Sequence, residues 1–259
     1  MFSFFKKKKD IVVEEKKALI PEDFTDIAPI ADYFKNETGV TFEKQTSILK
    51  NKVMTFCKLR SIHTFSELLT MVNNNASLKQ ELVDYLTTNE TFFYREFRQI
   101  EQLVNLVKNR SGHVEILCAP SATGEEPYSI AIALLEAGVL SSKFSIVGID
   151  INSEATHKAE EAIYRERNVR NLSDEIRQRY FTKNGDKYFL DASVKSLVTF
   201  KLINLFDSSF KMLGKFDFIF SRNMLIYFDK ETKIKAKNIL ESMRKDESVD
   251  VFFGHADLF

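Results

Sequence analysis

The sequence has few of the features that mark secreted, metal-bound or membrane-spanning proteins. It contains two cysteines, Cys57 and Cys118, which lie far apart within apolar patterns, so we expect free thiols in a reducing compartment. No apolar run reaches membrane-spanning length, and the apolar start followed by Lys6–Lys9 has the wrong order for a signal peptide. We therefore expect a cytoplasmic protein. The histidines fall in no catalytic cluster, and we expect no metal: His63, His113, His157 and His255.

Net charge is also absent, because 37 basic residues balance 37 acidic ones. Whole-chain charge therefore gives no reason to expect binding to nucleic acid or to an acidic membrane. A length of 259 residues, 44% of them hydrophobic, is enough for one large domain or two modest ones.

The most informative stretch runs from Val114 to Ile130. Its pattern predicts a buried strand over Val114–Cys118, a turn of small residues, and a helix that has Pro127 in its first turn. Such a unit lets a ligand approach the backbone at the carboxyl end of a sheet. Glu125 and Glu126 at the helix start would repel phosphate. A nucleoside that carries cationic groups, such as S-adenosylmethionine, suits this turn better.

The first part of the chain, to about Arg110, has helical patterns throughout. A first helix is predicted to stop at Gly39, and a second, basic helix spans Phe42–Arg60. Capping-box patterns at Thr64–Glu67 and Ser77–Gln80 predict two further helix starts. The basic helix fits an acidic partner or a solvated face equally well.

Three consecutive aromatic residues interrupt the helical pattern within residues 87–96. In one interpretation this stretch is an interdomain corner, where Phe92 and Phe93 fill the core. In the other, Asn89, Thr91 and Arg95 point into a ligand cleft between a helical domain and the domain after it. The stretch alone does not decide between the two interpretations.

Strands and helices alternate after Val114. Phe144–Asp150 and Phe216–Asn223 are predicted strands that end in polar residues, and Val249–Phe253 is the predicted last strand. Between them, about residues 165–202 interrupt the rhythm, and we predict a small antiparallel insert that contains strands at Lys187–Leu190 and Ser196–Leu202. The order predicts a mostly parallel sheet whose strand ends converge on one crevice. An acid placed like Asp150 is typical of ribose binding, and an acid that caps the helix after Asn152 would give the same spacing.

Four segments together resemble the CheR-type chemotaxis receptor methyltransferases: Thr88–Glu96, Ala122–Ser129, Asp150–Asn152 and Phe216–Asp229. The resemblance runs from about Ile30 to His255, and its Arg-Asn-x-x-Ile-Tyr-Phe-Asp segment is highly specific. The sequence departs from the family pattern at Pro120, where the turn usually begins with a glycine-containing stretch.

The resemblance implies an α/β fold: a Rossmann-like, mostly parallel methyltransferase domain with a small antiparallel β insert, preceded by an all-α N-terminal domain. It implies methyl transfer from S-adenosylmethionine to glutamate side chains on the cytoplasmic domains of chemotaxis receptors. In some members, the insert docks a receptor C-terminal peptide. The alternatives are a non-catalytic adaptor of the same fold, and a methyltransferase that acts on RNA or a small molecule.

Carried over by position, the resemblance also implies the site. The implied cofactor-binding residues are Asn89, Thr91, Arg95, Glu126, Asp150, Asn204, Leu205, Arg222 and Asn223. Asp150 would hold the ribose, Glu126 the methionine ammonium, and Asn204 with Leu205 the adenine. Arg95 and Tyr227 would lie beside the transferred methyl group. Considered without the family, Arg95 would be a structural ion-pair partner and Tyr227 a core aromatic residue.

These patterns together give a domain division. We expect a flexible segment at 1–25, a helical domain at 26–90, a linker helix at 91–112 and the cofactor-binding domain at 113–259. We expect a monomer that binds receptors and is neither membrane-embedded nor bound to nucleic acid.

Overall fold

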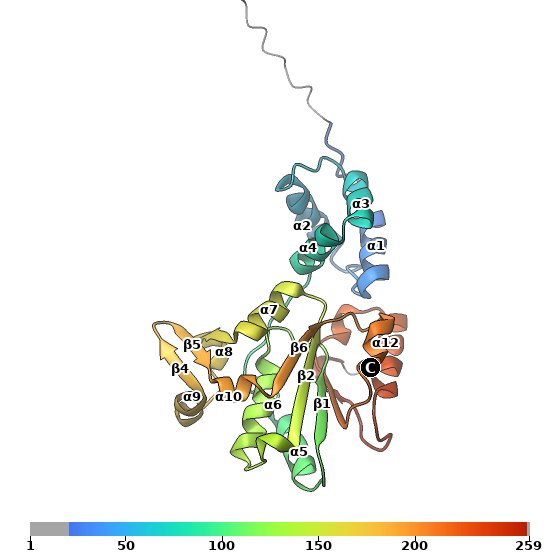
Figure 1. The fold of residues 1–259 in the computed structure, drawn as a ribbon. Helices are drawn as coiled ribbons and strands as arrows, with labels where there is room; N and C mark the ends of the chain where they lie inside the picture. Colours follow the sequence, from blue (N-terminus) through green and yellow to red (C-terminus); the bar gives the residue numbers. More distant parts are fainter. Residues whose placement is uncertain (1–20, 258–259) are drawn as a thin grey trace, which may run out of the picture.

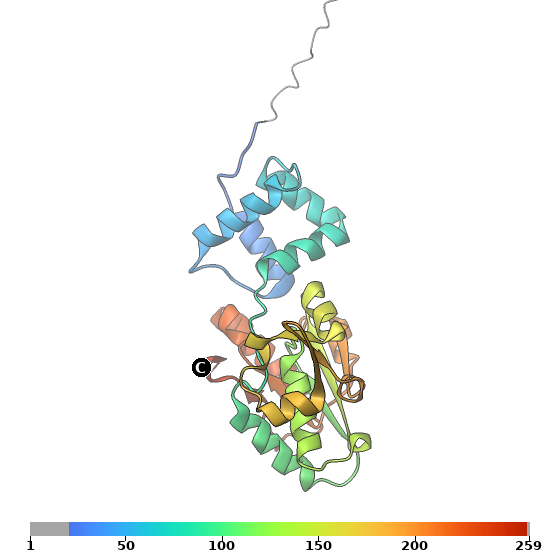
Figure 2. The ribbon, with the colours of Figure 1, turned by 90° about the vertical axis from the view of Figure 1, so that its left-hand side faces the viewer.

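The computed structural model describes residues 21–257, and most of the expected flexible segment 1–25 lies outside that range. A helical part sits at one end of a sheet-containing part (Figures 1 and 2). The principal helices are α1 (Ala28–Thr38), α2 (Thr46–Lys58), α3 (Phe65–Asn74), α4 (Ala76–Leu86), α5 (Phe97–Lys108), α6 (Glu125–Glu136), α7 (Ser153–Glu161) and α12 (Lys230–Ser242). Short helices are α8 (Glu166–Val169), α9 (Asp174–Tyr180), α10 (Ala192–Lys195) and α11 (Ser208–Lys211).

The helices α1 to α4 share one apolar core of their own, built from side chains between Ile27 and Leu86. α1 ends at Gly39 in the left-handed region, as predicted. α2 begins at Thr46, so the predicted start at Phe42 was wrong. Thr64 caps α3 by accepting the Glu67 N–H, as predicted, whereas Asn75 rather than Ser77 caps α4. An Asn side chain accepts at a helix start as well as a Ser hydroxyl does, which explains the shift.

A parallel sheet of five strands forms the centre of the second part, in the order β6-β2-β1-β7-β8. The strands are β1 (Val114–Cys118), β2 (Phe144–Asp150), β6 (Val198–Leu202), β7 (Phe218–Ser221) and β8 (Phe252–Phe253). Alternate side chains of β1 enter different cores, with Ile116 on one face and Leu117 on the other. α5 and α6 cover the first face and α12 covers the second (Figure 1). The strand order reverses at β1, and ligands bind at such a switch point in open α/β sheets.

The insert is a separate antiparallel sheet of three strands, in the order β3-β5-β4. Its strands are β3 (Ile163–Arg165), β4 (Phe181–Asn184) and β5 (Lys187–Leu190). The predicted antiparallel insert is confirmed, but the assignment of Ser196–Leu202 to it was wrong. β6 pairs in parallel with β2 and forms an edge of the main sheet. Strand pairing is a tertiary contact, so the alternation of a short strand does not reveal its partner.

Several polar contacts join the two parts around the carboxyl ends of the strands. The Thr41 N–H donates to the Tyr227 carbonyl at 2.9 Å, and Lys35 forms an ion pair with Asp229 at 2.5 Å. On the other side, Asp84 accepts from the Ser153 N–H at 2.7 Å. The helical part is therefore attached at two separate places on the rim of the sheet.

The structure tests whether the cysteines are paired and whether any helix could span a membrane. Cys57 and Cys118 are both buried and unpaired, so the predicted free thiols are confirmed. Within residues 21–257, no helix combines the length and the apolar character needed to cross a bilayer.

Candidate functional site

A cavity of about 1060 Å³ lies where the helical part meets the carboxyl ends of the strands. Its floor consists of the residues directly after β1, β2 and β7, and its roof comes from residues 38–52 and 87–95. Every predicted site residue except Asn204 lines this cavity. The strand ends thus converge as the sequence predicted, and the cavity has room for more than one ligand group.

The turn after β1 brings backbone close to the cavity. Ser121 N–H donates to the Ile149 carbonyl at 2.7 Å, which fastens the turn to β2. Gly124 has φ +92°, and a Cβ there would lie 3.0 Å from the Ala159 Cβ, so this position requires glycine. Pro120 lines the cavity after a cis peptide bond. The turn keeps contact with the cavity despite lacking the family's usual glycine-containing start.

Asp150 is buried at the end of β2, and its carboxylate is held by backbone on both sides. Oδ1 accepts the Asn152 N–H at 2.9 Å, and Oδ2 accepts the Ala122 N–H at 2.8 Å. Burial raises the pKa of this carboxyl to about 6, and the two backbone donors oppose that rise. Each oxygen keeps a lone pair that can accept a hydroxyl from a ligand.

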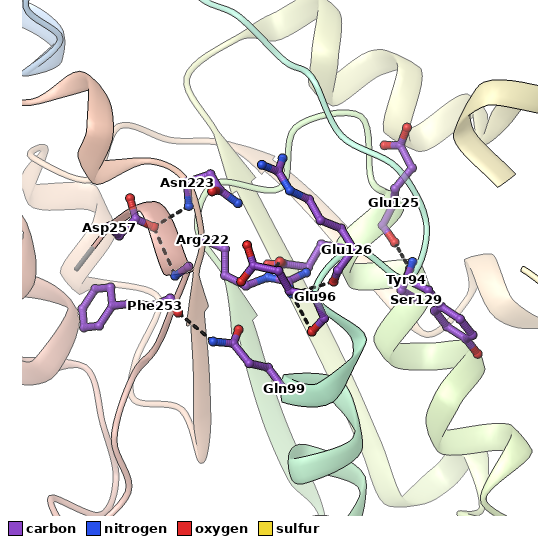
Figure 3. A network of polar contacts seen from close by, with 12 residues as sticks. Tyr94, Glu96, Gln99, Glu125, Glu126, Ser129, Arg222, Asn223, Phe253 and Asp257 are labelled. Atoms are coloured by element: carbon purple, nitrogen blue, oxygen red, sulfur yellow. Dashed lines mark hydrogen bonds and ion pairs between the residues drawn. The ribbon is translucent and has the colours of Figure 1, made fainter. Parts of the chain in front are cut away.

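Glu126 and Arg222 form a buried ion pair at the centre of the floor (Figure 3). The bond joins Arg222 Nε to Glu126 Oε2, and Arg222 Nη1 also donates to the Arg95 carbonyl at 2.7 Å. Burial raises the pKa of Glu126, and the guanidinium opposes that rise. Glu126 Oε1 has no hydrogen-bond partner among residues 21–257. A buried carboxylate oxygen without a donor is costly, so this atom is suited to accept from a cationic ligand.

Both interpretations of residues 87–96 are partly correct. Phe93 is fully buried in the core, with its ring 4.8 Å from that of Tyr164. Phe92 instead lines the cavity together with Asn89, Thr91 and Arg95. Arg95 Nη1 donates only to the Glu90 carbonyl, at 3.2 Å, and Arg95 forms no ion pair within the described residues. The guanidinium therefore remains available to an anion in the cavity.

Tyr227 lies in the short 3₁₀ turn Leu225–Tyr227 on the opposite wall. Its side chain is 38% exposed, whereas Phe228 beside it is buried, so Tyr227 is not a core residue. Asp257, which the sequence did not single out, fastens the start of this wall. Its Oδ2 accepts the N–H groups of Asn223 and Gly254 (Figure 3). Asp257 is fully buried, and Asn223, whose N–H it accepts, has φ +59°. Neither feature could be recognised from the sequence pattern.

Of the residues after β6, some line the cavity and one contacts the helical part. Leu205 lines the cavity, while the Asn204 side chain turns away and donates to the Glu37 carbonyl at 2.6 Å. Phe206 and Ile151 also line the cavity, and the sequence patterns did not identify them. Each comes shortly after a strand end, which is the signal that could have identified them. Together these apolar side chains form a wall suited to a flat base.

The arrangement fits a nucleoside with a ribose, an apolar base and a cationic tail. Asp150 offers oxygens for hydroxyl groups, Leu205 and Phe206 offer apolar surface, and Glu126 Oε1 offers an unpaired oxygen. S-adenosylmethionine has all three of these groups. Among residues 21–257, no group of three or more His, Cys, Asp or Glu side chains is arranged to hold a metal.

Comparison with known proteins identifies the family. The sequence model described as "CheR methyltransferase, SAM binding domain" matches residues 89–259. A chemotaxis protein methyltransferase of Campylobacter jejuni (strain 81-176) is 36% identical over 85% of this chain and 84% of the relative. Chemotaxis protein methyltransferase 2 of Vibrio cholerae is 33% identical, over 90% of this chain and 85% of the relative. The family match covers both the turn after β1 and the strand ends that form the cavity floor, and this chain belongs to the CheR methyltransferase family.

Proposed function

We propose that this chain transfers methyl groups from S-adenosylmethionine to glutamate side chains on the cytoplasmic domains of chemotaxis receptors, forming methyl esters. The observation that carries the proposal is the cavity floor. There, Asp150 and the unpaired oxygen of Glu126 lie at the ends of neighbouring strands in a chain of this family. Methyl esterification neutralises the receptor carboxylate, which suits a sensory adaptation role.

The cofactor would lie along the floor. Asp150 would accept the ribose hydroxyls, Glu126 Oε1 the methionine ammonium, and Leu205 with Phe206 would pack against adenine. Asn204 would act indirectly, because its bond to the Glu37 carbonyl holds the neighbouring Leu205 segment against the helical part. Arg222 would keep Glu126 ionised and oriented. When bound, the cofactor would supply a methyl group on a positively charged sulfonium, and its sulfur would be left as a neutral thioether once the substrate carboxylate oxygen holds the methyl group.

The chain's own part in the transfer is to position the substrate and exclude water. A glutamate with a reference pKa of about 4.3 is already ionised near neutral pH, so no general base is required. Arg95 can hold the substrate carboxylate through paired donors, and the Tyr227 hydroxyl can orient its second oxygen. Asn89 and Thr91 would close the roof beside them.

The protein would act in the cytoplasm, since its substrates would be cytoplasmic receptor domains. It would act there as a monomer. The antiparallel insert β3-β5-β4 would dock a receptor C-terminal peptide along a sheet edge, which is a common mode of peptide binding. The helices to residue 90, the linker helix at 91–112 and the sheet part from 113 would be the functional units.

Incubation with cofactor labelled at the methyl group, together with a purified receptor cytoplasmic fragment and total RNA, tests the reaction. We expect label on the receptor fragment, released by mild base as methanol because esters hydrolyse readily. Label on RNA would overturn the proposed substrate. Calorimetry with S-adenosylhomocysteine addresses the adaptor alternative, because an adaptor with an empty cofactor site would show no heat of binding.

A further inference from the structure

The segment that carries Arg95 has an unusual backbone. Tyr94 and Glu96, which flank Arg95, have φ +56° and φ +48°, in the left-handed region that side chains other than glycine rarely adopt. Such a conformation is unfavourable and persists only where the surrounding structure holds it in place. The contacts that hold this backbone therefore determine where the Arg95 guanidinium points in the cavity.

Three elements fix the main chain of consecutive residues in this segment. The Phe93 N–H donates to the Asn168 carbonyl in α8 of the insert, at 2.8 Å. The Tyr94 N–H donates to Ser129 Oγ in α6, at 3.0 Å (Figure 3). The carbonyl of the next residue accepts from Arg222 Nη1, after β7, at 2.7 Å. Of these three partners, only the Ser129 hydroxyl is neither a main-chain group nor part of the buried ion pair.

Two of the three partners are themselves fastened to Glu125, the first residue of α6. Ser129 is fully buried, and its hydroxyl donates to the Glu125 carbonyl at 2.5 Å while it accepts the Tyr94 N–H. The Asn168 side-chain amide donates to Glu125 Oε1 at 2.7 Å. Glu125 is also fully buried and lies outside the cavity lining. This acid therefore serves as an anchor for the Arg95 segment rather than as a ligand of the cofactor.

The anchor places the Arg95 segment relative to the cofactor side of the floor. Glu126, whose unpaired oxygen is the proposed ammonium acceptor, follows Glu125 in the first turn of α6. Ser129 lies four positions after Glu125 in the same helix, one turn further along. One helix thus carries both the ammonium acceptor and the hydroxyl that holds the strained turn. It would keep cofactor and guanidinium at a constant separation, which in-line transfer requires.

We propose that Ser129 is a positioning residue for methyl transfer, whose hydroxyl holds the strained turn at Tyr94 and thereby directs the Arg95 guanidinium toward the substrate carboxylate. Ser129 would touch neither cofactor nor substrate and would act through Arg95. This inference rests on the proposed function, in which Arg95 binds the target glutamate. The competing explanation is that the hydroxyl only completes the hydrogen bonding of the core, in which case its loss would lower stability and leave turnover unchanged.

The test variant is Ser129→Ala, which removes one buried hydroxyl and leaves the Tyr94 N–H without its acceptor. With saturating cofactor and receptor cytoplasmic fragment, we expect kcat to fall about tenfold, because a misplaced guanidinium aligns the carboxylate poorly in the transition state. Affinity for S-adenosylhomocysteine should be unchanged, since Asp150 and Glu126 keep their contacts. Ser129→Cys keeps a weaker acceptor, so its kcat should lie between that of Ser129→Ala and that of the wild type.

The matched control is Thr156→Val on α7. It removes a hydroxyl that is also buried, that also donates to the carbonyl four positions earlier, and that lies outside the cavity lining. We expect its kcat to equal that of the wild type. A similar fall in kcat in this control would overturn the proposal, because loss of any buried hydroxyl would then explain the effect. A wild-type kcat in Ser129→Ala would overturn it as well.

The same substitution in an Arg95→Lys background distinguishes positioning from packing. Lysine keeps the charge but lacks the planar, paired donors of arginine, so less alignment remains for Ser129 to provide. The loss caused by Ser129→Ala should therefore largely disappear in this background. An equal loss in both backgrounds would mean that Ser129 acts independently of Arg95, and the proposal would be wrong.

Hydrogen exchange over residues 90–97 gives a readout that does not depend on activity. We expect faster exchange in Ser129→Ala than in the wild type or in Thr156→Val, because the Tyr94 amide loses its partner and the strained turn opens more often. If exchange accelerates but the wild-type protein methylates no receptor fragment, Ser129 still holds the turn and the proposed reaction fails. If exchange is unchanged, the inference fails whichever substrate is methylated.

Discussion

The floor and the mouth of the cavity are built in opposite ways. On the floor, Asp150 accepts two backbone N–H groups and Glu126 is ion-paired to Arg222, all of them buried. At the mouth, between the start of α2 and the start of α12, the cavity is lined by lysines that have no ion-pair partner in the described part of the chain: Lys44, Lys52, Lys230 and Lys233. Groups fixed by burial suit one small ligand of constant shape, whereas surface charges without fixed partners suit a larger partner whose details vary.

The largest effect should come from breaking the floor at its ion pair. Arg222→Met leaves the Glu126 carboxylate buried without its partner, which costs about 3–5 kcal/mol of unfolding free energy. The measurement is urea denaturation of the ligand-free protein near neutral pH. The double variant that adds Glu126→Gln removes the stranded charge and should recover part of the loss. A double variant no more stable than the single one would contradict this account of the floor.

A second, smaller effect should appear in cofactor affinity. Asp150→Ala removes a charged acceptor of the ribose hydroxyls, and such a bond contributes about 1.5–3 kcal/mol, so affinity for S-adenosylhomocysteine should fall about 10- to 100-fold. Calorimetry measures the change. The shape-matched Asp150→Asn variant keeps one acceptor, so its affinity should lie between that of the wild type and that of Asp150→Ala. Unchanged affinity would leave Asp150 without a role in binding.

The pKa of Asp150 gives the same experiment a pH dependence. Because burial raises this pKa to about 6, the carboxylate takes up a proton as pH falls through 6, and wild-type affinity should decline below that value. The sign for folding is opposite. The folded state binds this proton more tightly than the unfolded chain does, so this group's contribution to stability falls as pH rises through the same range.

The smallest effect should arise at the boundary between floor and mouth. Tyr227→Phe removes one hydroxyl from a half-exposed ring, so turnover should slow severalfold, by about 1 kcal/mol, with cofactor affinity unchanged. Single-turnover transfer of labelled methyl groups measures it. The control is Tyr85→Phe, an exposed ring outside the cavity. A variant as fast as the parent would assign Tyr227 to packing alone.

The sequence predicted the floor better than the mouth for a physical reason. β1 and β2 are buried apolar runs, and the structure places their limits where the sequence did, at Val114–Cys118 and Phe144–Asp150. Polar residues directly after such strands must meet at one edge of a parallel sheet, so Asp150 and Asn223 could be placed near each other from the sequence alone. The parallel pairing of β6 could not be predicted, because it depends on a partner distant in sequence.

Side-chain pairing was equally inaccessible from sequence. Nothing in the local pattern indicates that Arg222 binds Glu126, which lies 96 positions earlier, or that Asn204 turns toward Glu37. The lysines of the mouth were visible on α2 as a basic face, but the same pattern describes an ordinary solvated helix.

Gly39 links the halves of the molecule more strictly than its place in a connecting turn suggests. It has φ +77°, and a Cβ there would lie 2.4 Å from Cε2 of Phe206, a ring that also lines the cavity. Any side chain with a Cβ at this position would clash with the Phe206 ring, so the helical region and the cavity wall are fitted to each other at this point. A helical region grafted onto this sheet part therefore has to keep a glycine at position 39 as long as Phe206 is retained.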